Sequence, residues 1–207
     1  MTWLARANRQ CYIAQLKPKH KVIGITPCVE NMPGARAQRP GDILTAKDGT
    51  TVEILNTDAE GRLILGDAIT YARTFKPDWI IEQSTLTGAC EYAVGKTYVA
   101  AMSKDDDFVD SIVDAASRAG DKAWKLPQGE EFDAGNKATY ADLQNISLSV
   151  KAGTSIGGAF VGHFAKDTKF CHLDIASKAW VDNMDYFRKG PTGAGLRIVV
   201  QRVLDEN

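Results

Sequence analysis

The chain has 207 residues, 44% of them hydrophobic and 25% charged, which suits one globular domain with a substantial core. Its formal net charge of -1 gives no electrostatic reason to expect nucleic acid or an anionic membrane as a partner. No apolar run approaches the roughly 18 residues that a membrane span needs, and the N-terminus lacks the apolar stretch of a secretory signal.

The predicted elements alternate between apolar runs and helical patterns, which favours an α/β fold. We expect strands over residues 21–29, 50–55, 79–82 and 170–176, and helices over residues 62–75, 106–119, 153–164 and 196–204. The third of these helices is small and apolar, which is typical of close packing. The polar residues 128–136 are expected to be irregular. No repeat or linker interrupts the chain, so residues 1–207 are taken as one domain.

The four cysteines are scattered and contain no Cys-x-x-Cys pair, which argues against a zinc knuckle or a disulfide framework. We expect buried free thiols in a reducing cytosol. The cysteines are Cys11, Cys28, Cys90 and Cys171.

The most informative segment runs from Asn56 to Arg62, between a predicted strand and a predicted helix, where α/β sheets place ligand sites. In extended backbone, residues i and i+2 point the same way, so Asp58 and Glu60 could direct two carboxylates at one divalent cation. Arg62 would add a positive charge that could hold an anion or a developing oxyanion. The spacing alone is also typical of helix capping and compensation of the helix dipole, and it does not decide between the two.

The longer segment Asn-Thr-Asp-Ala-Glu-Gly-Arg-Leu (residues 56–63) resembles the signature of the leucyl aminopeptidase family, the dinuclear metallopeptidases of the cytosol. Further motifs follow in family order: Val-Glu-Asn-Met-Pro (29–33), Thr-Leu-Thr-Gly-Ala (85–89), Trp-Lys-Leu-Pro (124–127), His-Leu-Asp-Ile-Ala (172–176) and Lys-Gly-Pro-Thr-Gly (189–193). The resemblance extends from about Ile13 to Leu204.

The resemblance implies a three-layer α/β/α fold with a mixed central sheet. It implies a cytoplasmic enzyme that releases N-terminal residues, preferentially leucine, from peptides with two divalent ions (Mn²⁺ or Zn²⁺, with Mg²⁺ as a further option). By position, Asp58 and Glu60 would be metal ligands, and Arg62 would be the catalytic arginine that holds a bicarbonate. The substrate site would be lined by Asn56, Thr85, Leu86, Gly88 and Ala176. For His172 and Asp174 we expect structural roles.

Part of the family pattern is not found. The family's N-terminal domain, the first strands of its catalytic domain, and a preceding Lys-Gly-x-x-Phe-Asp-Ser-Gly-Gly motif with metal-binding Lys and Asp residues do not occur here. With only Asp58 and Glu60 left, we expect weak metal binding and little activity. Three hypotheses follow: an aminopeptidase represented in part, an inactive homologue that binds peptide or assembles with a full-length relative, and a remnant without function. Family members form hexamers, so we expect oligomers.

Overall fold

The computed structural model describes residues 12–182 and 189–206, and its centre is a four-stranded mixed sheet. The sheet order is β3-β7-β4-β5. β3 runs parallel to β7, β7 antiparallel to β4, and β4 parallel to β5. The strands are β3 (Trp79–Ser84), β4 (Val99–Met102), β5 (Ala123–Lys125) and β7 (Lys169–Asp174).

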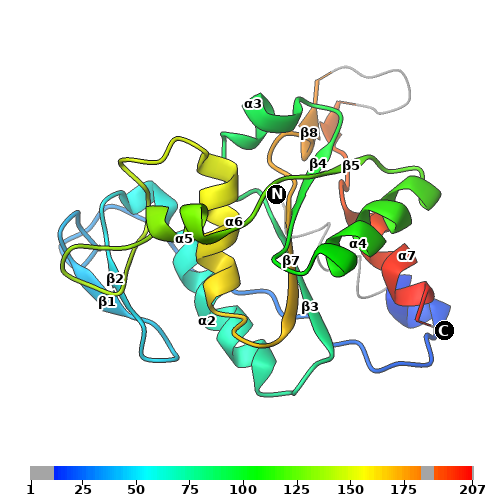
Figure 1. Cartoon of the computed structure of the whole chain (residues 1–207), viewed down its shortest axis with the longest axis horizontal. Helices are drawn as coiled ribbons and strands as arrows, with labels where there is room; N and C mark the ends of the chain where they lie inside the picture. Colours follow the sequence, from blue (N-terminus) through cyan, green and yellow to red (C-terminus); the bar gives the residue numbers. More distant parts are fainter. Residues whose placement is uncertain (1–11, 183–188, 207) are drawn as a thin grey trace.

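Helices cover both faces of this sheet, as Figure 1 shows, which confirms the predicted α/β class with a mixed sheet between helical layers. One face carries α2 (Gly61–Arg73) and α6 (Gly153–His163), and the other carries α4 (Asp106–Arg118) and α7 (Leu196–Leu204). All four helices were predicted: α2, α4 and α7 from the spacing of their apolar residues, and α6 from its small, apolar composition. Two short helices, α3 (Cys90–Val94) and α5 (Glu130–Gly135), lie at the periphery.

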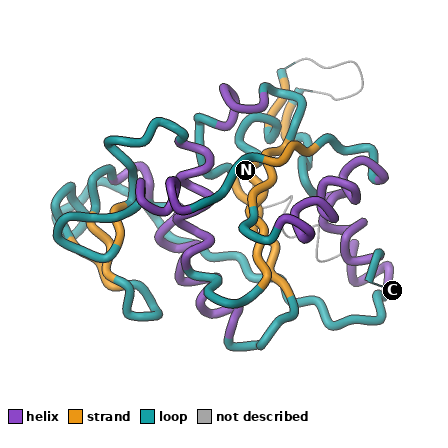
Figure 2. The backbone as a smooth tube through the Cα atoms, viewed as in Figure 1, coloured by secondary structure: helices purple, strands orange, loops and turns teal. Residues whose placement is uncertain are grey.

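Two small sheets lie outside the central one, and the tube in Figure 2 shows how short their strands are compared with the helices. β1 (Ile43–Thr45) pairs antiparallel with β2 (Thr51–Glu53), and β2 pairs parallel with β6 (Leu143–Gln144). β8 (Trp180–Val181) pairs with β9 (Gly190–Pro191). The first of these sheets matters for function, because β2 leads directly into the segment that begins at Asn56.

The two faces of β7 differ in chemistry, because alternate residues of a strand point to opposite sides. Cys171 and Leu173 are fully buried and belong to the apolar cluster that includes residues of α4 and α7. Phe170 belongs to the cluster that includes residues of α2 and α6. His172 and Asp174 share its side of the strand and are fully buried. The layer between the sheet and α2/α6 is therefore apolar at one end and polar at the end where β7 stops.

Glycines allow α6 to lie unusually close to its neighbours, as the small-residue composition predicted. A Cβ on Gly157 would lie 2.8 Å from Cγ2 of Thr87, and one on Gly158 would lie 2.9 Å from the sulfur of Met102. A Cβ on Gly66, in α2, would lie 2.7 Å from the ring of Phe164. The helical layer therefore presses directly on the sheet and on the loop that follows β3.

Three predictions need correction. Residues 21–29 do not form a buried strand: they are irregular, and Val22, Ile23 and Val29 are exposed, because no described strand pairs with them. Residues 128–136 are not wholly irregular, since α5 forms within them. Cys90 and Cys171 are buried free thiols as expected, but Cys28 is exposed. Cys11 lies outside the described residues.

Candidate active site

The segment Asn56–Arg62 turns sharply from β2 into α2. Asn56 is extended, and its side chain accepts a hydrogen bond from the backbone N–H of Asp58 (2.9 Å). Residues Thr57–Ala59 form a 3₁₀ turn, and α2 begins at Gly61. The extended backbone assumed for Asp58 and Glu60 is therefore wrong, because the Asn56 cap starts helical geometry before Asp58. Residues two apart in a helix lie on nearly opposite sides of its axis.

A buried amide that was not singled out from the sequence, Asn145, fixes the start of this turn. Its Oδ1 accepts hydrogen bonds from the N–H groups of Leu55 (2.8 Å) and Asn56 (3.2 Å), and its Nδ2 donates to the carbonyl of Asn56 (2.6 Å). Asn145 follows β6, which runs parallel to β2, so the segments that follow these two strands lie side by side. The loop that contains Asn31 adds a hydrogen bond to the carbonyl of Thr57 (3.2 Å).

Arg62 points into the interior and is only 8% exposed. Its guanidinium lies over the ring of Phe160, 5.7 Å from the centroid. Burial lowers the pKa of Arg62 to about 10, an effect that the Asp174 carboxylate partly offsets, so the group keeps its charge at neutral pH. A buried permanent cation next to a buried carboxylate marks the polar end of the layer between α2/α6 and the sheet.

Asp174 ends β7 and joins two loops. Its Oδ1 accepts hydrogen bonds from the N–H groups of Leu86 (3.2 Å) and Ala176 (3.0 Å). Its Oδ2 accepts hydrogen bonds from the N–H (3.0 Å) and the hydroxyl (2.7 Å) of Thr87. The loop after β3 and the loop after β7 thus meet at one carboxylate, as expected where parallel strands end together.

A second buried pair lies two residue pairs deeper in the sheet. His172 Nδ1 and Glu82 Oε2 form a short contact between β7 and β3, and His172 Nε2 lies 4.0 Å from Asp174 Oδ2. Burial alone would lower the pKa of His172, but the Glu82 and Asp174 carboxylates outweigh it, so its pKa lies above the ordinary value. Together with Arg62, these side chains form a buried polar cluster between the sheet and α2/α6.

The structure brings some of the predicted site residues together and leaves others on a separate segment. Leu86 and Ala176 are half-buried and lie close together, held by Asp174, while Thr85 and Gly88 in the same loop are exposed. The remaining residues belong to the turn before α2: Asn56 and Asp58 are exposed, and Glu60 is half-buried. Among the predicted site residues, Arg62 links the two groups through its charge interaction with Asp174.

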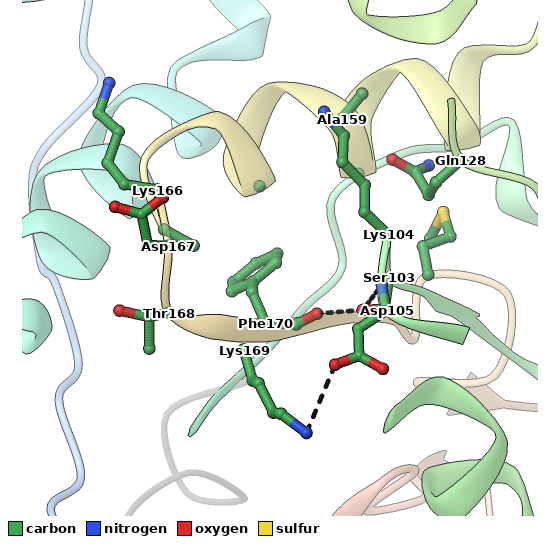
Figure 3. Close-up of a pocket in the computed structure, with 14 residues that line it drawn as sticks. Ser103, Lys104, Asp105, Gln128, Ala159, Lys166, Asp167, Thr168, Lys169 and Phe170 are labelled. Carbon is green, nitrogen blue, oxygen red and sulfur yellow. Dashed lines mark hydrogen bonds and ion pairs between the residues drawn. The ribbon is translucent and has the colours of Figure 1, made fainter. Parts of the chain in front are cut away.

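Two cavities lie near these elements. One, of about 340 Å³, lies beside Glu60 and is lined largely by apolar side chains such as Met32, Leu44 and Leu63. The other, of about 260 Å³, lies at the opposite end of β7 and contains none of the predicted site residues. Figure 3 shows that its lysines, Lys104, Lys166 and Lys169, point in different directions, so their ammonium groups do not converge on one ligand.

The described residues offer few ligands for a metal ion. Asp58 and Glu60 are carboxylates of the kind that divalent cations prefer. Within residues 12–182 and 189–206, however, no three His, Cys, Asp or Glu side chains are grouped so that they could hold a metal ion. No helix in that part of the chain is long and apolar enough to cross a membrane.

The chain is similar to proteins of one known family over most of its length. The catalytic domain of the cytosol aminopeptidase family matches residues 6–200. Proteins named probable cytosol aminopeptidase are similar to the chain: that of Azotobacter vinelandii is 46% identical over 90% of this chain and 37% of its own length. That of Solibacter usitatus is 44% identical over 93% of this chain and 40% of its own length.

The mixed α/β fold is consistent with the catalytic domain of this hydrolase family, which matches most of the chain. The chain belongs to the cytosol aminopeptidase family. It spans about two fifths of the length of the curated relatives that it matches.

Proposed function

We propose that the chain is part of a metal-dependent aminopeptidase that releases N-terminal residues, preferentially leucine, from peptides. The observation that carries this proposal is the meeting of Leu86 and Ala176 at Asp174, beside the buried cation of Arg62. The half-buried aliphatic side chains of Leu86 and Ala176 lie beside the exposed residues Thr85 and Gly88, which suits a substrate whose first residue has an apolar side chain. Family membership supports the same reaction class.

The described residues provide only part of the ligand set that the metal ions of this reaction would need. Asp58 and Glu60 match a divalent ion such as Mn²⁺, Zn²⁺ or Mg²⁺ in kind, but two carboxylates are fewer than the roughly three or four protein ligands that a zinc ion takes. In two-metal hydrolases the ions activate water and polarise the scissile carbonyl. Arg62, buried and charged, is the residue that would hold an anion such as bicarbonate near the reacting group.

An inactive homologue that binds peptide, or that assembles with a full-length relative, is the alternative. The observation that favours it is the absence, in the described part of the chain, of a third acidic or histidine ligand near Asp58 and Glu60. In this reading the loops at Asp174 would still bind an N-terminal residue, but no hydrolysis would follow. Both readings concern a cytoplasmic protein with peptide ligands, and for both we propose homo-oligomers, which sedimentation would test.

Binding and turnover can be measured separately. We expect the 207-residue chain to bind L-leucinamide more tightly than glycinamide, as measured by calorimetry, because only leucinamide fills an apolar site. Equal affinities would contradict the proposed substrate preference. Hydrolysis of leucine p-nitroanilide with Mn²⁺ then decides between enzyme and inactive homologue. We expect the chain alone to show little turnover, and a rate near that of a complete family member would refute the ligand argument.

Metal binding needs its own control. Asp58→Ala combined with Glu60→Ala should abolish any heat of Mn²⁺ binding, because both carboxylates of the proposed site are gone. Glu130→Ala combined with Glu131→Ala removes two exposed acidic side chains from α5 and should leave Mn²⁺ binding unchanged. If the first pair has no more effect than the second, the ion binds elsewhere.

A further inference from the structure

The two loops that the proposed function assigns to substrate binding come from segments almost 90 residues apart in the sequence. Leu86 follows β3 and Ala176 follows β7, and each offers its backbone N–H to the same oxygen, Oδ1 of Asp174. We propose that Asp174 is a positioning residue that fixes these two loops relative to each other and so sets the shape of the site. The proposal rests on the proposed function for its ligand, but not for its geometry.

The chemistry of the carboxylate suits this role. An ionised carboxylate is an acceptor only, and Asp174 receives four hydrogen bonds, three from backbone N–H groups and one from the hydroxyl of Thr87. An amide in its place would turn an NH₂ group toward one pair of these donors. The full burial of Asp174 is tolerated because Arg62 and His172 lie next to it.

The loop after β3 also packs against α6. Asp174 is therefore the contact that fixes its distance from the loop after β7. Thr154 in α6 places its hydroxyl 3.1 Å from that of Thr87, and Gly157 leaves room for the side chains of Thr87 and Leu86. The loop is thus held between a close-packed helix and a buried charge. If the charge is removed while the helix stays, the loop should lose its fixed distance from Ala176.

Amide hydrogen exchange on the whole 207-residue chain tests this directly, with Asp174→Asn as the variant. We expect the amides of Leu86, Thr87 and Ala176 to exchange about 10- to 100-fold faster, the factor that corresponds to a lost charge-assisted hydrogen bond. Asp121→Asn is the control, because Asp121 is also buried but binds the ammonium group of Lys178 and the N–H groups of Lys122 and Gly195. That variant should speed exchange at Gly195 and leave Leu86 and Ala176 unchanged.

A milder variant covers the case in which Asp174→Asn loosens the whole chain. Thr87→Val removes the hydroxyl contacts with Asp174 and Thr154 and keeps the shape of the side chain. We expect it to speed exchange at Leu86 and Ala176 by about fivefold, with Gly195 unchanged. If neither Asp174→Asn nor Thr87→Val changes Leu86 and Ala176 selectively, the positioning role is wrong.

Titration with L-leucinamide links the geometry to the ligand. We expect Asp174→Asn to weaken leucinamide binding at least tenfold, while Asp121→Asn binds like the wild type. If the exchange pattern appears but the affinity is unchanged, Asp174 does not position the site. If the wild type does not bind leucinamide at all, the proposed function fails, and the exchange experiment still decides whether Asp174 fixes the loops.

Discussion

Asn145 gives the most direct test of how the turn before α2 is built. Replacing it with alanine removes three hydrogen bonds, two accepted from Leu55 and Asn56 and one donated to Asn56. Each such bond contributes about 1 kcal/mol net. Because Asn56 is exposed and water can replace part of the loss, we expect the free energy of unfolding to fall by about 2–3 kcal/mol.

The matched control is Asn136→Ala. Asn136 is also buried, but within the described residues its side chain makes one hydrogen bond, from Nδ2 to the carbonyl of Ile156 (3.0 Å). Both variants lose the same atoms, so the cavity terms are similar and the difference reflects the hydrogen bonds. Urea unfolding followed by circular dichroism measures the free energy of unfolding of both variants. An unchanged dependence of that free energy on urea concentration would show that only the native state is affected. If Asn145→Ala is no more destabilising than Asn136→Ala, the amide does not hold the turn.

Three further outcomes are expected. Gly66→Ala should lower the thermal midpoint of unfolding, because a Cβ 2.7 Å from the Phe164 ring costs about 1–3 kcal/mol of overpacking. The gain in helix propensity, about 1 kcal/mol, offsets only part of this cost. Gly61→Ala is the control and should not lower the midpoint, because its Cβ would meet nothing within 4 Å. Phe160→Ala, which empties a fully buried site in α6, should cost about 3–5 kcal/mol in chemical denaturation. His172 has a raised pKa, so its stabilising interaction is complete below the unfolded value of about 6.5 and is lost as pH rises through the folded value. His172→Gln should therefore flatten the decline in stability above pH 6.5, and a decline identical to that of the wild type would contradict this.

The helices could be predicted from the sequence because their signals are local. Asp105 caps α4 by accepting from the N–H of Phe108 (2.9 Å), and the apolar residues that follow recur at helical spacing. The strand predicted for residues 21–29 failed because an apolar run becomes a strand only when another strand pairs with it. β4 was not predicted, because its four residues, Val99–Met102, are too few to distinguish a buried strand from other apolar segments. That residues 1–207 form one domain stays a prediction.

The site illustrates the same limit. The resemblance singled out Leu86 and Ala176, yet nothing local in the sequence says that they share an oxygen of Asp174. That contact depends on the register of β3 against β7, in which Glu82 pairs with His172 and Ser84 with Asp174, 90 residues apart. Register is set by which faces are buried, so it becomes visible only when the layers are assembled. The expectation of structural roles for His172 and Asp174 stays a prediction, which the exchange and stability experiments address.

Asp58 and Glu60 can be interpreted as metal ligands or as residues that stabilise the start of a helix, and the two interpretations are compatible with each other. Asn56 does cap the turn, and Asp58 lies near the N-terminus of α2, where an anion stabilises the helix dipole by about 0.3–1 kcal/mol. A carboxylate can serve this purpose and still bind a cation, because its second oxygen is free to do so. Loss of stability in an Asp58→Ala variant is therefore no evidence for or against a metal. Only the heat of Mn²⁺ binding, measured under conditions where the variant is folded, separates the ligand from the cap.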